Sequence, residues 1–265
     1  MFKFCSLYSG SSGNSLFVQT PETKLLIDAG ESAKKIENAL KEIDIDIREI
    51  NGILITHEHS DHIRGVTTIS KKFNLPVYAN KQTWEAMPEV LEKVQKENQK
   101  LFDINEDFDI GELKIKAFST PHDAANPCGF NIWYKDNKIS IATDLGHMDK
   151  NIINKLEGSS FVLLEANYDP NILKCSKYPY SLKQRIAGPN GHLSNEVAGK
   201  TISYLLNSGL RKVMLGHLSK ENNFPELAYK TVIDELYTTN SNENNLKISV
   251  ANRFMPSPIL DLDIL

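Results

Sequence analysis

The sequence predicts an α+β fold in which helices cover sheets. Two observations along its 265 residues predict this class. Apolar runs of strand length alternate with segments whose apolar residues recur at helical spacing. A strand-rich chain with helices between its strands buries the sheets against those helices. The 40% hydrophobic content suffices for one large core or two small ones, and composition does not decide between them.

The first elements follow from local patterns. Two apolar strands flank a Gly/Ser turn from Ser9 to Ser15, which predicts a hairpin. Ile36, Leu40 and Ile43 recur at helical spacing and predict a helix. A buried strand is predicted over residues 52–55, and it runs directly into a group of histidines.

The same alternation continues to the end of the chain. A helix is predicted after His192, with Ala198, Ile202 and Leu205 on one face. The Asn-rich stretch from Asn240 to Asn245 predicts a solvated loop before a last strand. Further strands are predicted at Leu113–Phe118, Gly129–Tyr134, Ile139–Ala142, Phe161–Leu164, Val213–Leu215 and Leu246–Val250.

Composition restricts the classes of protein. No stretch approaches the roughly 18 apolar residues that a membrane span needs, and the N-terminus lacks the pattern of a signal peptide. Three widely spaced cysteines argue against a disulfide framework, so we expect a cytoplasmic protein. The net charge of -4 means that any nucleic acid must be held by a local patch or by bound metal rather than by the overall field.

Polar residues gather at the ends of the predicted strands. Such ends are where α/β architectures build sites, because the strands are rigid and the loops are free to vary. Five endings of this kind indicate a single cleft. The residues are Asp28, His57, Asp144, Glu165 and His217.

The segment Thr56-His57-Glu58-His59-Ser60-Asp61-His62 carries the strongest signal in the sequence. Imidazole and carboxylate are the ligands that zinc, manganese and iron accept. Residues two apart in extended chain point the same way, so His57 and His59 can bind one ion. Asp61 and His62, in the following turn, can face a second ion. The alternative, a polar helix cap, explains one histidine better than it explains three.

Two metal ions about 4 Å apart need further ligands, ideally a carboxylate that bridges them. His122, Asp144 and His217 each follow an apolar run and are candidates. Taken alone, each residue type is more often a cap or a surface residue, and the nearby histidine segment favours the metal interpretation.

This pattern resembles the metallo-β-lactamase superfamily over residues 28 to 217. The resemblance implies a four-layer αββα sandwich, which we expect to form a single domain over residues 1–265. It also implies roles for the matching residues. One ion would take His57, His59 and His122, the other Asp61, His62 and His217, with Asp144 bridging and Asp28 supporting the site.

Several segments also resemble the WalJ/YycJ subfamily of that superfamily. They include Ser9–Asn14, the histidine segment, Ala142–Gly146, Leu164–Asn167, Tyr178–Arg185, Gly191–Asn195 and Gly216–Asn223. The resemblance implies a metal-dependent 5′-to-3′ exonuclease that acts on duplex DNA, with two divalent ions (zinc, manganese or iron). From the composition we expect no membrane association, and no obligate protein partner is inferred. Tyr168 departs from the expected pattern, where a histidine should follow Glu-Ala-Asn, and its role stays open.

Phosphodiester hydrolysis fits these residues. Two cations lower the pKa of a shared water and stabilise charge on the phosphoryl oxygens. Asp61 is expected to be essential to this chemistry through the metal it holds. Glu165 and His192 are candidates for protonating the leaving group, because a carboxylate orients an imidazole and favours its charged form. A helix cap is the alternative role for His192.

A basic segment from Pro170 to Asn195 lacks acidic residues and is a candidate substrate arm. Cations contact backbone phosphates and tyrosines stack on bases, although an ordinary solvated loop has the same composition. The turn at Ser11 and Asn14 can present backbone N–H groups to phosphate, or can simply close the hairpin. The arm residues are Lys174, Lys177, Tyr178, Tyr180, Lys183 and Arg185.

Two other functions compete with this prediction. A ribonuclease, or a small-ester or thioester hydrolase, could use the same ligands. The small-molecule enzymes would have little need of the basic segment. A non-catalytic metal-binding regulator is the rival from another class, and the complete ligand set argues against it.

Overall fold

The computed structural model describes residues 1–239 and 246–263, which fall into two compact units. Unit 1 contains Met1–Ser119, Ala124–Lys135 and the C-terminal segment from Asn252. Unit 2 contains Thr120–Asp123 and Asp136–Ala251. The expectation of one domain over residues 1–265 stays a prediction, and the predicted loop at 240–245 lies outside the described residues.

Unit 1 is built on a seven-stranded sheet in which β1, β2 and β3 are antiparallel and β3 to β6 run parallel. The predicted hairpin is confirmed, with Phe4 of β1 opposite Val18 of β2. In sheet order the strands are β14 (Leu260–Asp261), β1 (Lys3–Tyr8), β2 (Ser15–Gln19), β3 (Lys24–Ile27), β4 (Gly52–Leu54), β5 (Val77–Ala79) and β6 (Gln99–Leu101).

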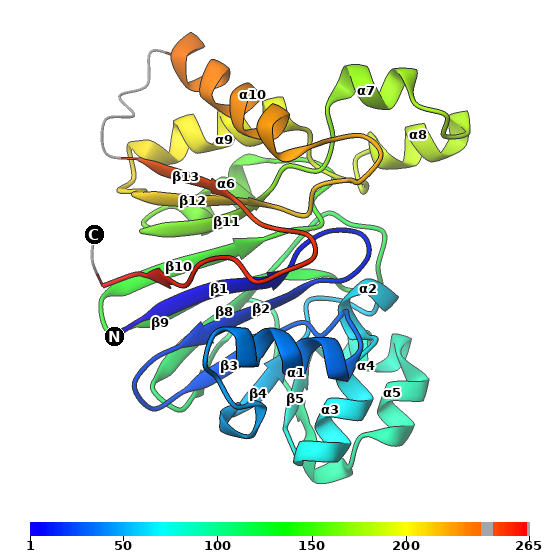
Figure 1. Cartoon of the computed structure of the whole chain (residues 1–265), viewed down its shortest axis with the longest axis vertical. Helices are drawn as coiled ribbons and strands as arrows, with labels where there is room; N and C mark the ends of the chain where they lie inside the picture. Colours follow the sequence, from blue (N-terminus) through cyan, green and yellow to red (C-terminus); the bar gives the residue numbers. More distant parts are fainter. Residues whose placement is uncertain (240–245, 264–265) are drawn as a thin grey trace. The chain divides into compact units, whose positions relative to one another are not determined.

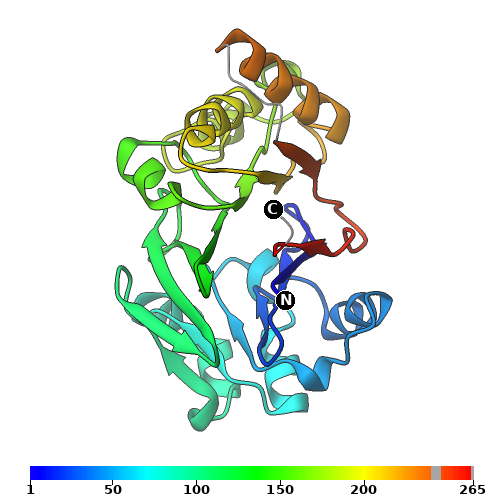
Figure 2. The same cartoon turned by 90° about the vertical axis from the view of Figure 1, so that its left-hand side faces the viewer.

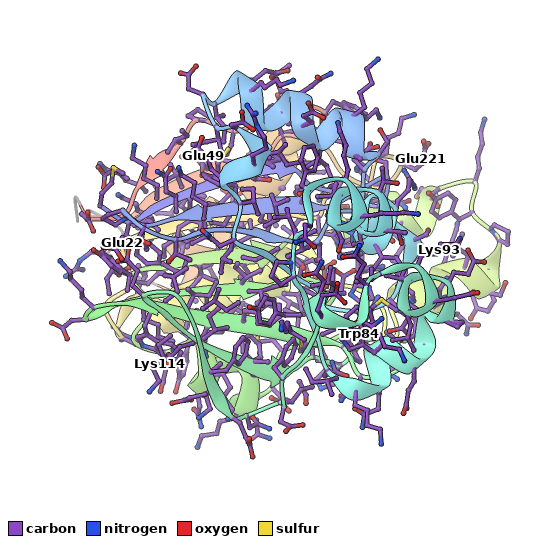
Figure 3. The ribbon with its side chains drawn as sticks, turned by 90° about the horizontal axis from the view of Figure 1, so that it is seen from below. Glu22, Glu49, Trp84, Lys93, Lys114 and Glu221 are labelled. Carbon is purple, nitrogen blue, oxygen red and sulfur yellow. The ribbon has the colours of Figure 1, made fainter. Side chains whose placement is uncertain are left out.

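Helices cover this sheet because their apolar faces match its buried side chains. Ile36 and Leu40 of α1 are buried in one cluster with Leu26 of β3, which confirms the predicted helix (Figure 1). Trp84 of α4, labelled in Figure 3, is also buried, and its indole Nε1–H donates to the Lys100 carbonyl at 3.1 Å. The helices of unit 1 are α1 (Ala33–Glu42), η1 (Ile47–Glu49), α2 (Ser60–Ile63), α3 (Val66–Phe73), α4 (Lys81–Ala86), α5 (Pro88–Lys93) and η2 (Lys96–Asn98).

Three further strands of unit 1 form an antiparallel ribbon: β7 (Asp107–Ile110), β8 (Leu113–Ser119) and β9 (Cys128–Tyr134). The predictions for β8 and β9 are correct to within a residue at each end. The strand β7 was not predicted, because acidic residues alternate with its few apolar ones and hide the apolar run.

Unit 2 is built on four parallel strands, β10 (Asn137–Ala142), β11 (Phe161–Glu165), β12 (Lys212–Gly216) and β13 (Lys247–Val250). The helices α9 (Asn195–Leu206) and α10 (Pro225–Thr238) lie side by side, in yellow and orange (Figures 1 and 2). The other helices are α6 (Lys150–Leu156), α7 (Pro170–Cys175) and α8 (Tyr180–Ile186).

The strands of unit 2 direct their carboxyl ends to one edge. Because β10, β11 and β12 are parallel, the residues that follow them share that edge, as the sequence predicted for Asp144, Glu165 and His217. In the part of the chain that the structure describes, no helix is long and apolar enough to cross a membrane.

Candidate metal centre

Unit 1 carries its candidate ligands on the loop Thr56–His62, the ligand loop, which follows β4. His57 Nε2 lies 3.1 Å from His59 Nδ1. Two nitrogens bound to one zinc ion at about 2.0–2.1 Å with tetrahedral angles lie about 3.3 Å apart. The spacing of this histidine pair therefore fits a shared divalent ion, as the sequence predicted.

Asp28 fixes the orientation of the ligand loop. Its Oδ1 accepts from the Thr56 backbone N–H at 2.9 Å, and its Oδ2 accepts from the Thr56 hydroxyl at 2.8 Å. The same Oδ2 lies 2.7 Å from His62 Nδ1, so that nitrogen carries the proton and Nε2 is the candidate ligand atom. The carboxylate is buried, and its contacts are compatible with the expected supporting role, which stays a prediction.

Asn14 has a role that the sequence did not reveal. It was predicted to bind substrate, yet its side chain is buried and contacts the ligand loop. Its Nδ2 lies 3.1 Å from His62 Nε2 and 3.3 Å from Asp61 Oδ2, and its backbone N–H donates to the Asp61 carbonyl at 2.7 Å. Asn14 thus holds Asp61 and His62 in place, while Ser11 in the same turn is exposed.

A substitution at Asp28 tests whether its carboxylate orients His62 for metal binding. In Asp28→Asn the amide nitrogen would face His62, whose proton would then move to Nε2 and block the metal-binding atom. Metal affinity is expected to fall about 10- to 100-fold, measured by calorimetric titration of the apoprotein. Asp28 has φ 61°, a region that asparagine also tolerates, so the backbone is preserved.

Asp44→Asn is the matched control for this variant. Asp44 is exposed and has φ 60°, so it carries the same backbone strain without touching the ligand loop. Its metal affinity should equal that of the wild type. Unchanged affinity in Asp28→Asn would show that Asp28 does not set the state of His62.

Unit 2 centres on the Glu165 carboxylate, which has no exposed surface. Its Oε1 accepts from His192 Nδ1 and from His217 Nδ1, both at 2.8 Å. Its Oε2 accepts from the backbone N–H groups of Leu145 at 2.8 Å and Leu193 at 3.1 Å. Four donors therefore satisfy one buried anion. Burial raises the pKa of Glu165, but His192 and His217 lower it more, and the net pKa lies well below its usual range.

His122 and Asp144 complete this cluster. His122 Nδ1–H donates to the Gly191 carbonyl at 3.0 Å, which leaves Nε2 as the ligand atom, 3.6 Å from Asp144 Oδ1. Burial lowers the pKa of His122 and so favours the neutral form that binds metal. Asp144 Oδ1 also lies 3.3 Å from His217 Nδ1. Unit 2 thus brings together the candidate ligands His122, Asp144 and His217. Glu165 and His192 lie in the same cluster, as predicted.

Backbone strain marks the same positions. Asp28, Asp144 and His217 each follow a strand and each have φ near +60°. Non-glycine residues in this region cost of order 1–3 kcal/mol and persist where the surroundings impose them, typically at functional sites. The sharp turn at each strand end directs these side chains into their clusters.

About half of the basic segment of unit 2 is helical rather than open loop, since it contains α7 and α8. Lys183 Nζ donates to the carbonyls of Lys174 and Ser176, at 2.7 and 2.6 Å, and Arg185 forms an ion pair with Asp123. These two cations therefore have structural contacts. The side chains of Lys174, Lys177 and Tyr180 are exposed, and Tyr178 is half-buried.

His192 and Tyr168 both lie near the start of α9. The cap of α9 is Ser194, whose side chain accepts from Val197 N–H, so His192 does not have the capping role. Its side chain is 22% exposed and reaches solvent while it stays bonded to Glu165. Tyr168 is buried and pairs with Ser194 in an isolated bridge, which gives it a structural position.

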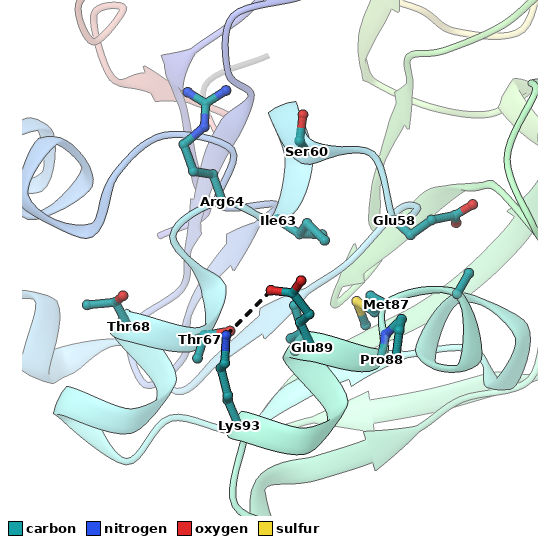
Figure 4. Close-up of a pocket in the computed structure, with 12 residues that line it drawn as sticks. Glu58, Ser60, Ile63, Arg64, Thr67, Thr68, Met87, Pro88, Glu89 and Lys93 are labelled. Carbon is teal, nitrogen blue, oxygen red and sulfur yellow. Dashed lines mark hydrogen bonds and ion pairs between the residues drawn. The ribbon is translucent and has the colours of Figure 1, made fainter.

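A groove of about 620 Å³ borders the ligand loop within unit 1 (Figure 4). Glu58 and Ser60 line it from the loop, and Ile63, Met87 and Glu89 line it from the helices. Glu58 is half-buried and accepts from the Ala125 N–H at 2.7 Å. The groove leaves one side of the ligand loop open to a bound molecule.

Comparisons with known proteins agree with this geometry. Residues 23–218 match the family described as the beta-lactamase superfamily domain. Exodeoxyribonuclease WalJ of Streptococcus pneumoniae is 40% identical over 237 residues, 89% of this chain and 88% of that protein. Exodeoxyribonuclease YycJ of Bacillus anthracis is 36% identical over 229 residues, 86% of this chain and 87% of that protein.

A solved structure supports the fold. The metallo-beta-lactamase fold protein YhfI of Bacillus subtilis superposes with a TM-score of 0.70 at 14% identity, covering 97% of this chain and 99% of that one. The predicted α+β class and αββα sandwich are confirmed. Fold and ligand clusters together define a metal-dependent hydrolase. The chain belongs to the beta-lactamase superfamily and, within it, to the family of the WalJ and YycJ exodeoxyribonucleases.

Proposed function

We propose that the chain is a 5′-to-3′ exonuclease that degrades duplex DNA at a centre of two divalent ions. Zinc, manganese and iron all suit the donor set. His57, His59 and His122 would hold one ion, Asp61, His62 and His217 would hold the other, and Asp144 would serve both. The relatives named exodeoxyribonuclease support the DNA substrate. The expectations of a cytoplasmic location and no obligate protein partner stay predictions.

One observation carries this proposal. A hydrogen bond through Nδ1 holds each of His62, His122 and His217, and so presents its Nε2 as a ligand atom. These hydrogen bonds favour a catalytic metal centre over a metal-binding protein that has lost its catalytic activity. When bound, the two ions supply a water nucleophile at neutral pH and neutralise charge on the phosphoryl group.

His192 and Glu165 act on the leaving group. His192 donates the proton from its Nε2 to the leaving alkoxide oxygen, and its Nδ1–H stays bonded to Glu165. The Glu165 carboxylate, held as an anion by four donors, stabilises the imidazolium before the transfer. The groove beside the ligand loop has the volume of a small-molecule site and provides room for the terminal nucleotide.

The test uses linear duplex DNA labelled at one 5′ end, with manganese or zinc added. Labelled mononucleotides should appear at once, and chelator should stop their release. A duplex labelled at the 3′ end should release its label last. Early release of the label from the 3′ end would show 3′-to-5′ polarity instead. No release with any metal would reject duplex DNA, and structured RNA and a glutathione thioester would then separate the rival functions.

The arm in unit 2 gives a further prediction. Lys174 and Lys177 are exposed, so replacing both with alanine removes charge without breaking the contacts of Lys183 and Arg185. We expect KM for duplex DNA to rise about 10-fold, and binding to lose about 1–2 units of salt dependence. Fluorescence anisotropy over a salt series measures both affinity and slope.

Lys200→Ala is the matched control, because Lys200 is an exposed lysine of α9 outside the arm. It should leave KM unchanged. Cleavage of a small phosphodiester by the Lys174 and Lys177 variant should match the wild type. Equal KM values for duplex DNA in this variant and the wild type would remove the arm from the substrate site.

A further inference from the structure

The turn Ser9–Asn14, the Ser/Gly turn, is rigidly attached to the ligand loop. Gly13 N–H donates to the Gly10 carbonyl at 2.9 Å, and Gly10 N–H donates to Asn14 Oδ1 at 2.8 Å. Asn14 N–H in turn donates to the Asp61 carbonyl. A group bound at this turn would therefore have a fixed position relative to Asp61.

Two arginines from distant parts of the sequence converge on Ser12. Arg64 Nη1 donates to the Ser12 carbonyl at 3.2 Å, and Arg253 Nη1 lies 3.4 Å from the Ser12 hydroxyl. The Arg253 guanidinium also lies over Gly10, where an added Cβ would come within 2.6 Å of it. Gly10 has φ +141°, a backbone conformation that favours glycine.

The surroundings of Ser12 are locally positive. Glu31 is the acidic partner of this region, and it lies 3.0 Å from Lys35 and 3.7 Å from Arg64. Two guanidinium groups, those of Arg64 and Arg253, thus contact Ser12 in a chain whose net charge is -4. A guanidinium carries five N–H donors in a planar fork, and two of them can pair with one phosphate.

An exposed aromatic residue stands next to this charge. Phe254 is 66% exposed and Met255 is 55% exposed, and the Phe254 ring centroid lies 5.9 Å from the Arg253 guanidinium carbon. The segment is anchored where it ends, because Ser257 N–H donates to the Ser6 carbonyl at 2.8 Å. Phe254 is therefore presented to solvent from fixed backbone rather than from a loose end.

We propose that Ser12, Arg64 and Arg253 bind a backbone phosphate of the DNA substrate and that Phe254 stacks on a base beside it. Arginine pairs bind phosphate through charge and geometry, and aromatic rings stack on unpaired bases. An exonuclease acting on a duplex meets such bases where the end opens. This inference rests on the proposed function and adds a second DNA contact, within unit 1, to the arm of unit 2.

The experiment measures binding of labelled DNA with an open end to metal-loaded Asp61→Ala protein, which does not degrade it. Arg253→Ala and Arg64→Ala should each weaken binding about 10-fold and reduce the slope of log K against log salt by about 0.7–0.9. Phe254→Ala should weaken binding about 10-fold at an unchanged slope, because stacking releases no counterions. Melting temperature and bound metal should match the parent protein in all three.

Two further variants of Phe254 distinguish stacking from simple apolar contact, and an arginine variant elsewhere serves as a control. Phe254→Trp should restore binding and Phe254→Leu should not, since leucine keeps an apolar surface without a ring to stack. Arg48→Ala is the matched control, an exposed arginine of η1 paired with Asp46, and it should bind normally.

Three results would contradict different parts of this proposal. Unchanged affinity and slope in both arginine variants would overturn the phosphate contact. Full binding by Phe254→Leu would overturn the proposed stacking of Phe254 on a base. Failure of the parent protein to bind any DNA would reject the proposed substrate, and it would be seen before any second variant is compared.

Discussion

Asp61→Ala is expected to lower the rate of DNA hydrolysis about 1,000-fold or more and to leave the protein folded. Asp61 is the one carboxylate of the ligand loop that is positioned for a metal ion, and its Oδ2 lies 3.6 Å from His62 Nε2. Without it the second ion would bind weakly, and a centre that needs both ions would lose its nucleophile and its charge stabilisation. Single-turnover cleavage of labelled duplex measures the loss.

Metal content separates this explanation from a folding defect. The variant should retain the ion at His57 and His59 and lose much of the other, as elemental analysis of the purified protein would show. Asp103→Ala is the matched control, because Asp103 is an exposed aspartate of unit 1 that lies outside the ligand loop and the groove, and it should leave turnover unchanged. Normal turnover by Asp61→Ala would contradict the proposed two-ion centre.

The sequence predicts the ligand clusters well because their signals are local. The ligand loop lies within seven consecutive residues, and Asp144, Glu165 and His217 each follow an apolar strand. Strand ends of a parallel sheet meet at one edge, so position along the chain was enough to place them together. The helices α1 and α9 were found in the same way, from apolar spacing.

Contacts between distant segments were beyond prediction. Nothing near Asn14 in the sequence indicates a bond to Asp61, and nothing links Arg253 to Ser12, 241 positions away. The role of the basic segment was also predicted from composition alone, and composition does not indicate the contacts of Lys183 and Arg185. Such roles depend on tertiary packing, and packing has no local periodicity from which it could be read.

Glu165→Gln is expected to damage both the stability of unit 2 and its metal binding. A carboxylate can accept from all four of its donors, whereas a glutamine amide must turn its own NH₂ group toward two of them. Either orientation leaves buried donors facing a donor, at a cost of about 2–5 kcal/mol in the free energy of unfolding. Chemical denaturation of the apoprotein measures this cost without the contribution of metal.

The two orientations of the amide predict different damage. If its oxygen faces the histidines, His192 and His217 keep their protons on Nδ1, and the backbone N–H groups of Leu145 and Leu193 lose their acceptor. If its nitrogen faces them, His217 loses its Nε2 ligand atom and metal affinity falls about 10- to 100-fold. NMR of the ring nitrogens distinguishes these states. Glu157→Gln, at an exposed position in the same unit, should change neither property, and a wild-type stability for Glu165→Gln would show that the four bonds do not support the site.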